Sequence, residues 1–196
     1  MASVFCQLLA LSAFVYVARG QELFALSEEE KEAIVAAHNA YRKEEGATAM
    51  QRLRWSDGLQ QFAEGMALRC SNGHGGDDEY NNVAGFERIG ENFYAGWGFE
   101  PTVQSAIDAW MSEKQEFAGV LNHATGHYTQ IVWLDTTDVG CAVSKCSDGG
   151  TRIYCDYGIA GNWGYTLPIS YGDPGSECSD RYPGEASDGD GLCVHA

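Results

Sequence analysis

Apolar positions recur at helical spacing in the first half of the chain, beginning with a segment between Ser27 and Gly46. Ser27 and Glu30 match a capping box, which is typical of a helix start. Gly46 is typical of a helix end, because glycine readily adopts the left-handed backbone found there. The periodic positions of this segment are Ile34, Ala37, His38 and Tyr41. We therefore expect a helix that packs one face on a core.

Two further segments have the same periodicity. One opens at Ser56 or Asp57 and carries a stripe that ends at Cys70, and the other covers residues 102–117. The stripes consist of Leu59, Phe62 and Met66 in the first segment and of Val103, Ile107, Trp110 and Phe117 in the second. We expect two more amphipathic helices, with Cys70 in the last turn of its helix and facing the core.

Alternating positions in the second half predict strands. Residues 127–134 alternate aromatic, polar and β-branched side chains, which predicts a strand with His127 at its entrance. Two more strands, over residues 138–145 and 152–157, flank a Ser-Asp-Gly-Gly turn centred on Asp148. Helices followed by a three-stranded antiparallel sheet predict an α+β fold.

The cysteine count indicates disulfide bonds. Cys6 belongs to an apolar leader, and an even number of cysteines remains beyond it: Cys70, Cys141, Cys146, Cys155, Cys178 and Cys193. An even set behind a leader is typical of a protein that folds in an oxidising compartment. No CxxC pair occurs, which argues against a cysteine zinc site.

The predicted hairpin also predicts the pairing of these cysteines. Its turn places Cys141 opposite Cys155, and directly opposed antiparallel residues meet the distance limits of a disulfide. Cys146 has the opposite parity and faces the other side of the sheet, so we expect it to bond Cys70 on a covering helix. The two remaining cysteines then close the tail.

The chain divides into a leader, one domain and a tail. Residues 1–20 contain a short apolar run and end in small residues, which predicts a signal peptide cleaved before Gln21 and hence secretion. Residues 21–169 form the domain. Residues 170–196, closed by a Cys178–Cys193 bond, form a Gly-, Asp- and Ser-rich tail with few apolar residues to dock.

The charge of the chain restricts its partners. The net charge of −16 becomes −17 after cleavage, because Arg19 is the only charged residue of the leader. A strongly anionic domain repels nucleic acid and anionic membrane surfaces. No segment is long and apolar enough to predict a transmembrane helix. We expect a soluble extracellular monomer.

Two motifs carry a family resemblance. The stretch Gly126-His127-Tyr128-Thr129-Gln130-Ile131-Val132-Trp133 and the stretch from Ile153-Tyr154-Cys155-Asp156-Tyr157 through Gly161-Asn162-Trp163 resemble the two signatures of the CAP superfamily. This superfamily comprises cysteine-rich secretory, antigen 5 and pathogenesis-related 1 proteins. The resemblance covers residues 27–165 and is that of a single-domain, venom-allergen-like member. It implies an α-β-α sandwich and the Cys70–Cys146 and Cys141–Cys155 pairings.

The resemblance also implies a cleft with two histidines and two acids. The matching residues are His74 after the second-helix cysteine, Glu91 of Gly90-Glu91-Asn92, Glu113 after Trp110, and His127 of the first signature. Such a set fits a divalent cation, most readily Zn²⁺, with the carboxylates as ligands or as groups that orient the rings. A His–Glu network that only braces the loops is the alternative. Glu113 and Lys114 lie at opposite margins of their helix stripe, so the pattern alone does not decide which enters a cleft.

The same residues allow a function as an enzyme or as a binding protein. His74, Glu91, Glu113 and His127 are candidate acid–base groups, and metal-assisted hydrolysis is the enzymatic alternative. No activated nucleophile is evident, because the chain has no GxSxG or HExxH motif and Ser71 near His74 is weak support. We therefore expect a non-enzymatic binding or effector protein.

Aromatic residues suggest a ligand class for that protein. The resemblance implies a sterol, a fatty acid or an extracellular protein receptor as partner. Gly96 and Gly98 loosen an aromatic cluster formed by Phe93, Tyr94, Trp97 and Phe99, which are the candidate lipid contacts. The alternative is that these rings fill the core.

Overall fold

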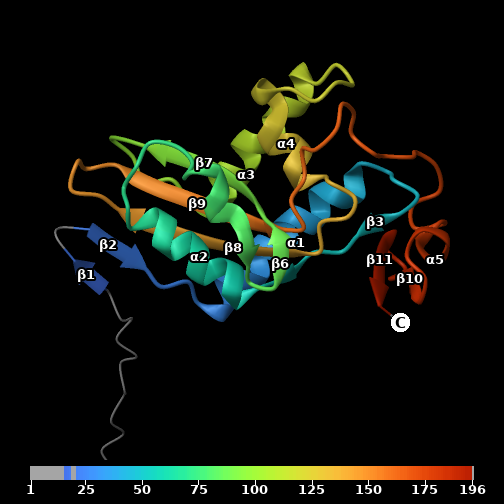
Figure 1. The fold of residues 1–196 in the computed structure, drawn as a ribbon, viewed down its shortest axis with the longest axis horizontal. Coiled ribbons are helices and arrows are strands. Elements are labelled where there is room, and N and C mark those ends of the chain that lie inside the picture. Colours follow the sequence, from blue (N-terminus) through green and yellow to red (C-terminus); the bar gives the residue numbers. More distant parts are fainter. Residues whose placement is uncertain (1–15, 19–20, 196) are drawn as a thin grey trace, which may run out of the picture.

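The structure is a computed structural model that describes residues 16–18 and 21–195 (Figure 1). The predicted signal peptide lies outside the described residues except for strand β1. The helices are α1 (Glu28–Glu44), α2 (Asp57–Ala67), α3 (Val103–Ser112), α4 (Gly126–Ile131) and α5 (Cys178–Arg181), with 3₁₀ helices η1 (Asp77–Tyr80), η2 (Glu113–Glu116) and η3 (His123–Thr125). The strands are β1 (Tyr16–Ala18), β2 (Gln21–Phe24), β3 (Met50–Gln51), β4 (Arg54–Trp55), β5 (Asn81–Val83), β6 (Phe86–Arg88), β7 (Gly90–Gly96), β8 (Asp138–Lys145), β9 (Thr151–Gly158), β10 (Glu185–Ser187) and β11 (Leu192–His195).

The main sheet is built around the predicted hairpin of β8 and β9. Cys141 pairs with Cys155 and Val143 with Ile153, so the predicted register is confirmed. The strand order is β1-β2-β8-β9-β7, and β4 adds to β8 in parallel. Strand β7 pairs antiparallel with β9 and is the last strand at its side of the sheet.

Helices cover both faces of this sheet. Alternate residues of β8 point to opposite sides: Cys141 and Val143 join a core with α1, α3 and α4, whereas Ala142 joins a second core with α2. Figure 1 shows α1 and α2 on opposite sides of the sheet. The α+β fold with α-β-α layers is confirmed.

The strand predicted over residues 127–134 is wrong, because Gly126–Ile131 form helix α4. Tyr128, Ile131 and Val132 are all buried at i, i+3 and i+4, and a short buried apolar run does not distinguish helix from strand by its periodicity. A tertiary contact holds the last residue of α4 and the segment that follows it. The guanidinium of Arg42 in α1, fully buried, donates to the carbonyls of Ile131, Trp133, Leu134 and Thr136.

The three predicted helices are present with different ends. In α1 the capping box of Ser27 and Glu30 is confirmed. Helix α2 ends at Ala67, so the prediction that Cys70 lies in its last turn is wrong; Cys70 follows the helix with a positive φ of 53°. The third predicted helix is divided into α3 and η2, and Phe117 follows both.

The three predicted disulfides are confirmed. Cys70–Cys146 joins the segment after α2 to the end of β8, and Cys141–Cys155 links β8 to β9. Cys178–Cys193 closes the tail. The bond at Cys70 therefore fixes the start of the loop that leads to His74.

The tail docks on the domain more closely than its composition predicts. Strand β11 pairs in parallel with β3, and Leu192 is 1% exposed within the main core. Arg181 forms an ion pair with Asp135, and Arg52 pairs with Asp188. Among the described residues, no helix is long and apolar enough to cross a membrane.

Candidate functional site

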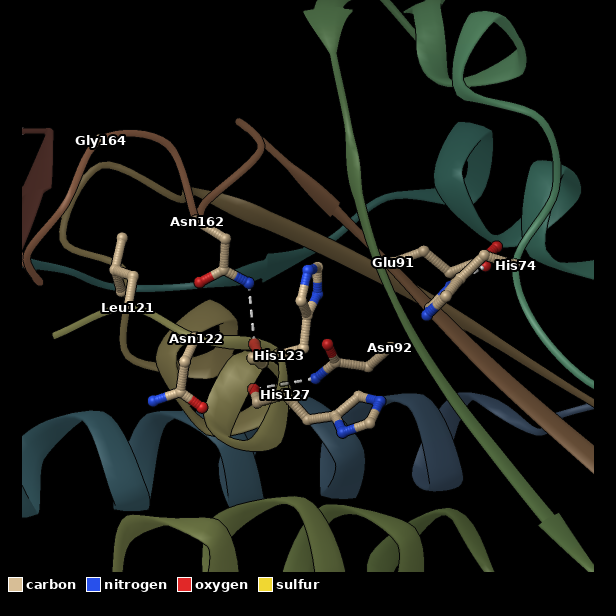
Figure 2. A pocket seen from close by; sticks show the side chains of 10 residues that line it. His74, Glu91, Asn92, Leu121, Asn122, His123, His127, Asn162 and Gly164 are labelled. Carbon is tan, nitrogen blue, oxygen red and sulfur yellow. Dashed lines mark hydrogen bonds and ion pairs between the residues drawn. The ribbon is translucent and has the colours of Figure 1, made fainter. Parts of the chain in front are cut away.

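A cavity of about 720 Å³ opens beside β7 (Figure 2). Its walls come from the loop after α2, from β7, from η3 and α4, and from the loop after β9. Three predicted site residues line it: His74, Glu91 and His127. The other lining residues are Asn92, Leu121, Asn122, His123, Gly126, Asn162 and Gly164. Glu113 lies outside the lining but contacts His127, so the fold brings all four predicted residues to one site.

Strand β7 supplies the cavity from both faces of the sheet. Consecutive residues of a strand point to opposite sides, and Glu91 and Asn92 follow this rule. Glu91 faces the α2 side, where it meets Tyr80. The Asn92 amide faces the other side and donates to the His127 carbonyl at 3.1 Å and to the Tyr157 hydroxyl at 3.3 Å. Because β7 is the last strand at this side, one cavity reaches both residues.

His74 is attached to the sheet through Glu91. Its Nδ1 lies 2.8 Å from Oε1 of Glu91, which also accepts the Tyr80 hydroxyl at 2.9 Å. The His74 side chain is 51% exposed, whereas that of Glu91 is 2% exposed. The hydrogen bond to Glu91 raises the pKa of His74 above its ordinary value, against the opposing effect of partial burial. The Gly75 N–H donates to the Tyr80 hydroxyl, which holds the same loop.

His127 is held by backbone as well as side-chain contacts. Its Nδ1 lies 2.6 Å from Oε1 of Glu113. Oε2 of Glu113 accepts the backbone N–H groups of His127 and Tyr128 at the start of α4. The imidazole also stacks on Trp110, with ring centroids 5.9 Å apart. The first turn of the helix thus fixes this ring.

The structure decides between the two residues at the margins of the third predicted helix. Glu113 turns toward His127. Lys114 instead forms an ion pair at 2.7 Å with Glu45, the residue that follows α1. The two neighbours therefore serve different interfaces of the same 3₁₀ helix.

The two histidines leave the same atom available. Each ring uses Nδ1 for a carboxylate, and within the described residues neither Nε2 has a hydrogen-bond partner. If Nδ1 carries the proton, Nε2 offers a lone pair to a ligand. Glu91 and Glu113 are already engaged by the donors described above, so they orient the rings. In the described part of the chain, no three His, Cys, Asp or Glu side chains lie close enough together to hold a metal ion.

Sequence reasoning missed several residues of the site. His123 on η3 is a third imidazole in the cavity, and the loop that carries it has no periodic pattern to mark it. Asn162, within the second signature, accepts from Thr129 at 2.6 Å and donates to the Gly126 carbonyl at 2.8 Å. These contacts attach the loop after β9 to the first turn of α4.

The weak nucleophile candidate is not activated by a histidine. The Ser71 hydroxyl contacts the Gly73 carbonyl and the Tyr154 hydroxyl. No hydrogen bond joins it to His74 among the described residues.

The four aromatic residues predicted as lipid contacts do not share one surface. Phe93 packs on Tyr154 in the core beneath α2, and Tyr94 packs in the main core on the other face. Trp97 is 48% exposed and stacks on the Arg152 guanidinium, and Phe99 is also exposed. Phe93 and Tyr94 are consecutive residues of a strand and point to opposite faces of the sheet. The four residues therefore do not form one patch for a lipid.

Sequence comparisons relate the chain to known proteins. Residues 35–157 match the model of the CAP family, described as the cysteine-rich secretory protein family. The chain is 36% identical over 156 residues to GLIPR1-like protein 1 of Homo sapiens, covering 74% of this chain and 64% of that protein. It is 30% identical over 172 residues to a pathogenesis-related protein of PR-1 type from Sambucus nigra. This match covers 83% of this chain and 96% of the plant protein. The chain therefore spans less than two thirds of the human relative and almost all of the plant relative.

Solved structures share the fold. The hookworm platelet inhibitor superposes with a TM-score of 0.71 at 24% identity, over 87% of this chain and 92% of that one. NaASP2, solved with Zn²⁺, superposes with a TM-score of 0.70 at 24% identity. The superposition covers 86% of this chain and 97% of NaASP2. At these identities the likeness shows the fold alone. The family match, which covers more than half of the sequence, shows that the chain belongs to the cysteine-rich secretory protein (CAP) family.

Proposed function

We propose that this chain is a secreted extracellular binding protein and not an enzyme, and that its cavity binds a divalent cation between His74 and His127. One observation carries the proposal. Both imidazoles line one cavity, and each has Nδ1 bound to a carboxylate and Nε2 free of any partner in the described residues. Three disulfides support folding in an oxidising compartment, which is consistent with secretion.

The donor atoms suit Zn²⁺ best. Imidazole nitrogen is a preferred zinc ligand, and a carboxylate on the second ring nitrogen fixes the tautomer and increases the basicity of the ligand. His74 and His127 would hold the ion, and Glu91 and Glu113 would orient them. Since the described residues offer no third side chain close enough, we expect weaker binding than in a closed four-ligand zinc site. When bound, the ion supplies positive charge for an anionic group of a partner.

Proteins of the same fold have been solved with metal ions. NaASP2 was solved with Zn²⁺ and Ac-ASP-7 in a manganese-bound form. Their identities of 24% and 18% carry only the fold to this chain. The proposal therefore rests on the two imidazoles and their carboxylates.

The lining favours a polar ligand over a sterol or fatty acid. Apart from glycines, Leu121 is the one apolar residue among those that line the cavity. The predicted aromatic contacts are also divided between two cores and the surface. An extracellular protein receptor, contacted through the bound cation or beside it, fits this lining better than a lipid does.

The hydrolase alternative has less support. The His74–Glu91 and His127–Glu113 pairs could transfer protons, and a bound cation could supply an activated water, but no side-chain nucleophile is hydrogen-bonded to either pair among the described residues. The Ser71 hydroxyl is hydrogen-bonded to the Tyr154 hydroxyl and to the Gly73 carbonyl. An assay of the zinc-loaded protein on a broad panel of peptides and esters, with His127→Ala as control, tests this alternative.

Calorimetric titration with ZnCl₂ near pH 7.5 tests the cation site. We expect one ion per chain in the wild type and no stoichiometric binding in His74→Ala or His127→Ala. His123→Ala is the matched control, because this ring lines the same cavity without a carboxylate partner in the described residues; it should weaken binding less than either of the other two. Wild-type binding in both His74→Ala and His127→Ala would show that zinc binds elsewhere. An absence of binding to the wild type would leave the two pairs as a bracing network.

A further inference from the structure

Beneath the His74 pair lies a second carboxyl group that the proposed function does not use. Asp156 of β9 stands directly opposite Glu91 of β7 in the sheet register. Directly opposed residues of two antiparallel strands point to the same face, so the two side chains meet under α2. Asp156 is fully buried, and the Glu91 side chain is 2% exposed. Two acidic groups therefore share one nearly dry position.

The hydrogen bonds around this pair are unequal. Oε1 of Glu91 accepts from Tyr80 and is bonded to His74. Oε2 of Glu91 and both carboxyl oxygens of Asp156 are buried, and among the described residues no donor reaches them. Two ionised carboxylates in this place would repel each other and leave three buried oxygens without a donor. One proton between the two groups removes the repulsion and forms one hydrogen bond, which engages two of these three oxygens.

The surroundings determine which group carries that proton. Glu91 already has two donors, which stabilise its anion, whereas Asp156 has none. The residue opposite Asp156 on β8 is Gly140, which has no side chain, and α2 lies so close that a Cβ there would come within 2.2 Å of the Gln60 nitrogen.

Within the part of the chain that the structure describes, no positively charged group acts on Asp156 to offset its burial. Helix α2 contributes apolar side chains to this face, and Arg69 just after it pairs with Glu79. The titratable groups that act on Asp156 or respond to it are Glu91, Tyr80 and Tyr157. Burial and the charge of Glu91 together raise the pKa of Asp156 well above its ordinary value.

We propose that Asp156 is a neutral carboxylic acid that donates its proton to Oε2 of Glu91, and that it thereby positions Glu91 and the His74 ring. Asp156 is a positioning residue in this account, because it contacts Glu91 and not a ligand. Its role in cation binding rests on the proposed function, whereas its protonation and its effect on the His74 ring do not. Asp156 contacts Glu91, and Glu91 in turn contacts His74. Through these contacts, two residues of the rigid sheet orient an imidazole ring on an exposed loop.

Infrared spectroscopy of the full chain tests the protonation. We expect the carbonyl band of a protonated carboxylic acid at pH 7 in the wild type and its loss in Asp156→Asn. Asp138→Asn is the matched control, because Asp138 is another buried acidic residue and forms an ion pair with Arg54 at 2.9 Å; the acid band should remain in this variant. No acid band in the wild type, or a band that survives Asp156→Asn, would overturn the proposal.

Two variants test the positioning role. Asp156→Asn keeps the shape and offers an amide N–H to Glu91, so the His74 ring resonances in ¹⁵N NMR should stay near the wild-type values. Asp156→Leu removes the donor, so the His74 resonances should shift while those of His127 do not. Zinc affinity should then fall roughly ten- to a hundredfold in Asp156→Leu and little in Asp156→Asn.

The ring resonances separate the two proposals. If the wild type binds no zinc, the proposed function fails while the resonances of His74 still report on Asp156. Unchanged His74 resonances in folded Asp156→Leu would overturn the positioning role. If Asp156→Leu does not fold, a displaced His74 ring in Asp156→Asn would overturn it, and a retained ring with loss of the acid band would support it.

Discussion

The two histidine–carboxylate pairs of the cavity have similar bond lengths but different supports. His127 lies on α4, stacks on Trp110, and shares Glu113 with two backbone N–H groups. His74 lies on a loop and is half exposed, and it is held by the buried Glu91. The first pair is therefore fixed by a helix end. The second pair depends on side chains beneath the loop and on the disulfide at its start.

This difference separates two ways to hold a ring at a cavity wall. A helix end provides several parallel contacts, so one lost bond leaves others in place. An imidazole on a loop depends on contacts arranged in series, so loss of any one of these contacts frees the imidazole. Variants that remove members of each support should therefore affect one ring and spare the other.

The largest effect should come from removal of the Cys70–Cys146 bond. The bond spans 76 residues, so replacing both cysteines by alanine should lower the free energy of unfolding by about 4 kcal/mol in the chain-entropy model. The variant should lose the fixed position of His74 while α4 keeps His127. Denaturant unfolding and the two sets of histidine ring resonances measure these effects.

Removal of the Cys178–Cys193 bond is the matched control. This bond spans 15 residues and should contribute about 3 kcal/mol, with neither ring affected. Equal disturbance of both rings in either variant would contradict the separation of the two supports.

Glu113→Ala should have the next largest effect. It leaves the backbone N–H groups of His127 and Tyr128 and the His127 ring without their acceptor, which should cost about 2 kcal/mol of stability. The His127 resonances should shift and zinc binding should weaken. Glu116→Ala, an exposed position on the same 3₁₀ helix, is the control and should change neither quantity. A similar loss of stability and zinc binding in Glu113→Ala and Glu116→Ala would contradict this prediction, because it would show that the stability of η2 is the cause.

Tyr80→Phe should have a smaller effect, confined to the His74 side. It removes the hydroxyl that donates to Glu91 and accepts from Gly75, which should cost about 1 kcal/mol. Tyr94→Phe is the control, since in the described residues the Tyr94 hydroxyl makes no hydrogen bond. Thermal unfolding and the His74 resonances are the measurements. A shift at His127 as large as that at His74 would contradict this prediction.

The pH dependence should be the smallest effect. The bond to Glu91 raises the pKa of His74 above 6.5, so its charged form stabilises the fold. This contribution is complete below about pH 6.5 and is lost as the pH rises through the pKa of the folded protein. The stability difference between the wild type and His74→Gln should therefore decrease from pH 6 to pH 9. A stability difference that grows from pH 6 to pH 9 would contradict the upward direction of the His74 pKa shift.

Local signals made part of the fold predictable. The turn around Asp148 determines the register of β8 and β9, and that register accounts for two of the disulfides. Residues 126–131 were not predictable by the same means, because a short buried apolar run does not distinguish a helix from a strand, and the contact at the helix end comes from Arg42, which is distant in sequence. Strand β7 was also missed, since its pairing partner lies about 60 residues away in the chain.

The candidate site was only partly predictable for a related reason. Motifs identify His74 and His127, but the choice between Glu113 and Lys114 depends on Glu45, just after α1, which forms an ion pair with the lysine. The role of Asp156 depends on its position opposite Glu91 and on the burial of both. Strand pairing and burial are properties of the assembled sheet, and no short stretch of sequence contains them.

The central claim is that the two Nε2 atoms act together on one cation. The most direct test follows the ring nitrogens of His74 and His127 by ¹⁵N NMR while ZnCl₂ is added near pH 7.5. The account predicts that both Nε2 resonances shift along one binding curve that saturates at one ion per chain, while both Nδ1 atoms remain protonated. Two independent curves, or a response of only one ring, would contradict a shared site.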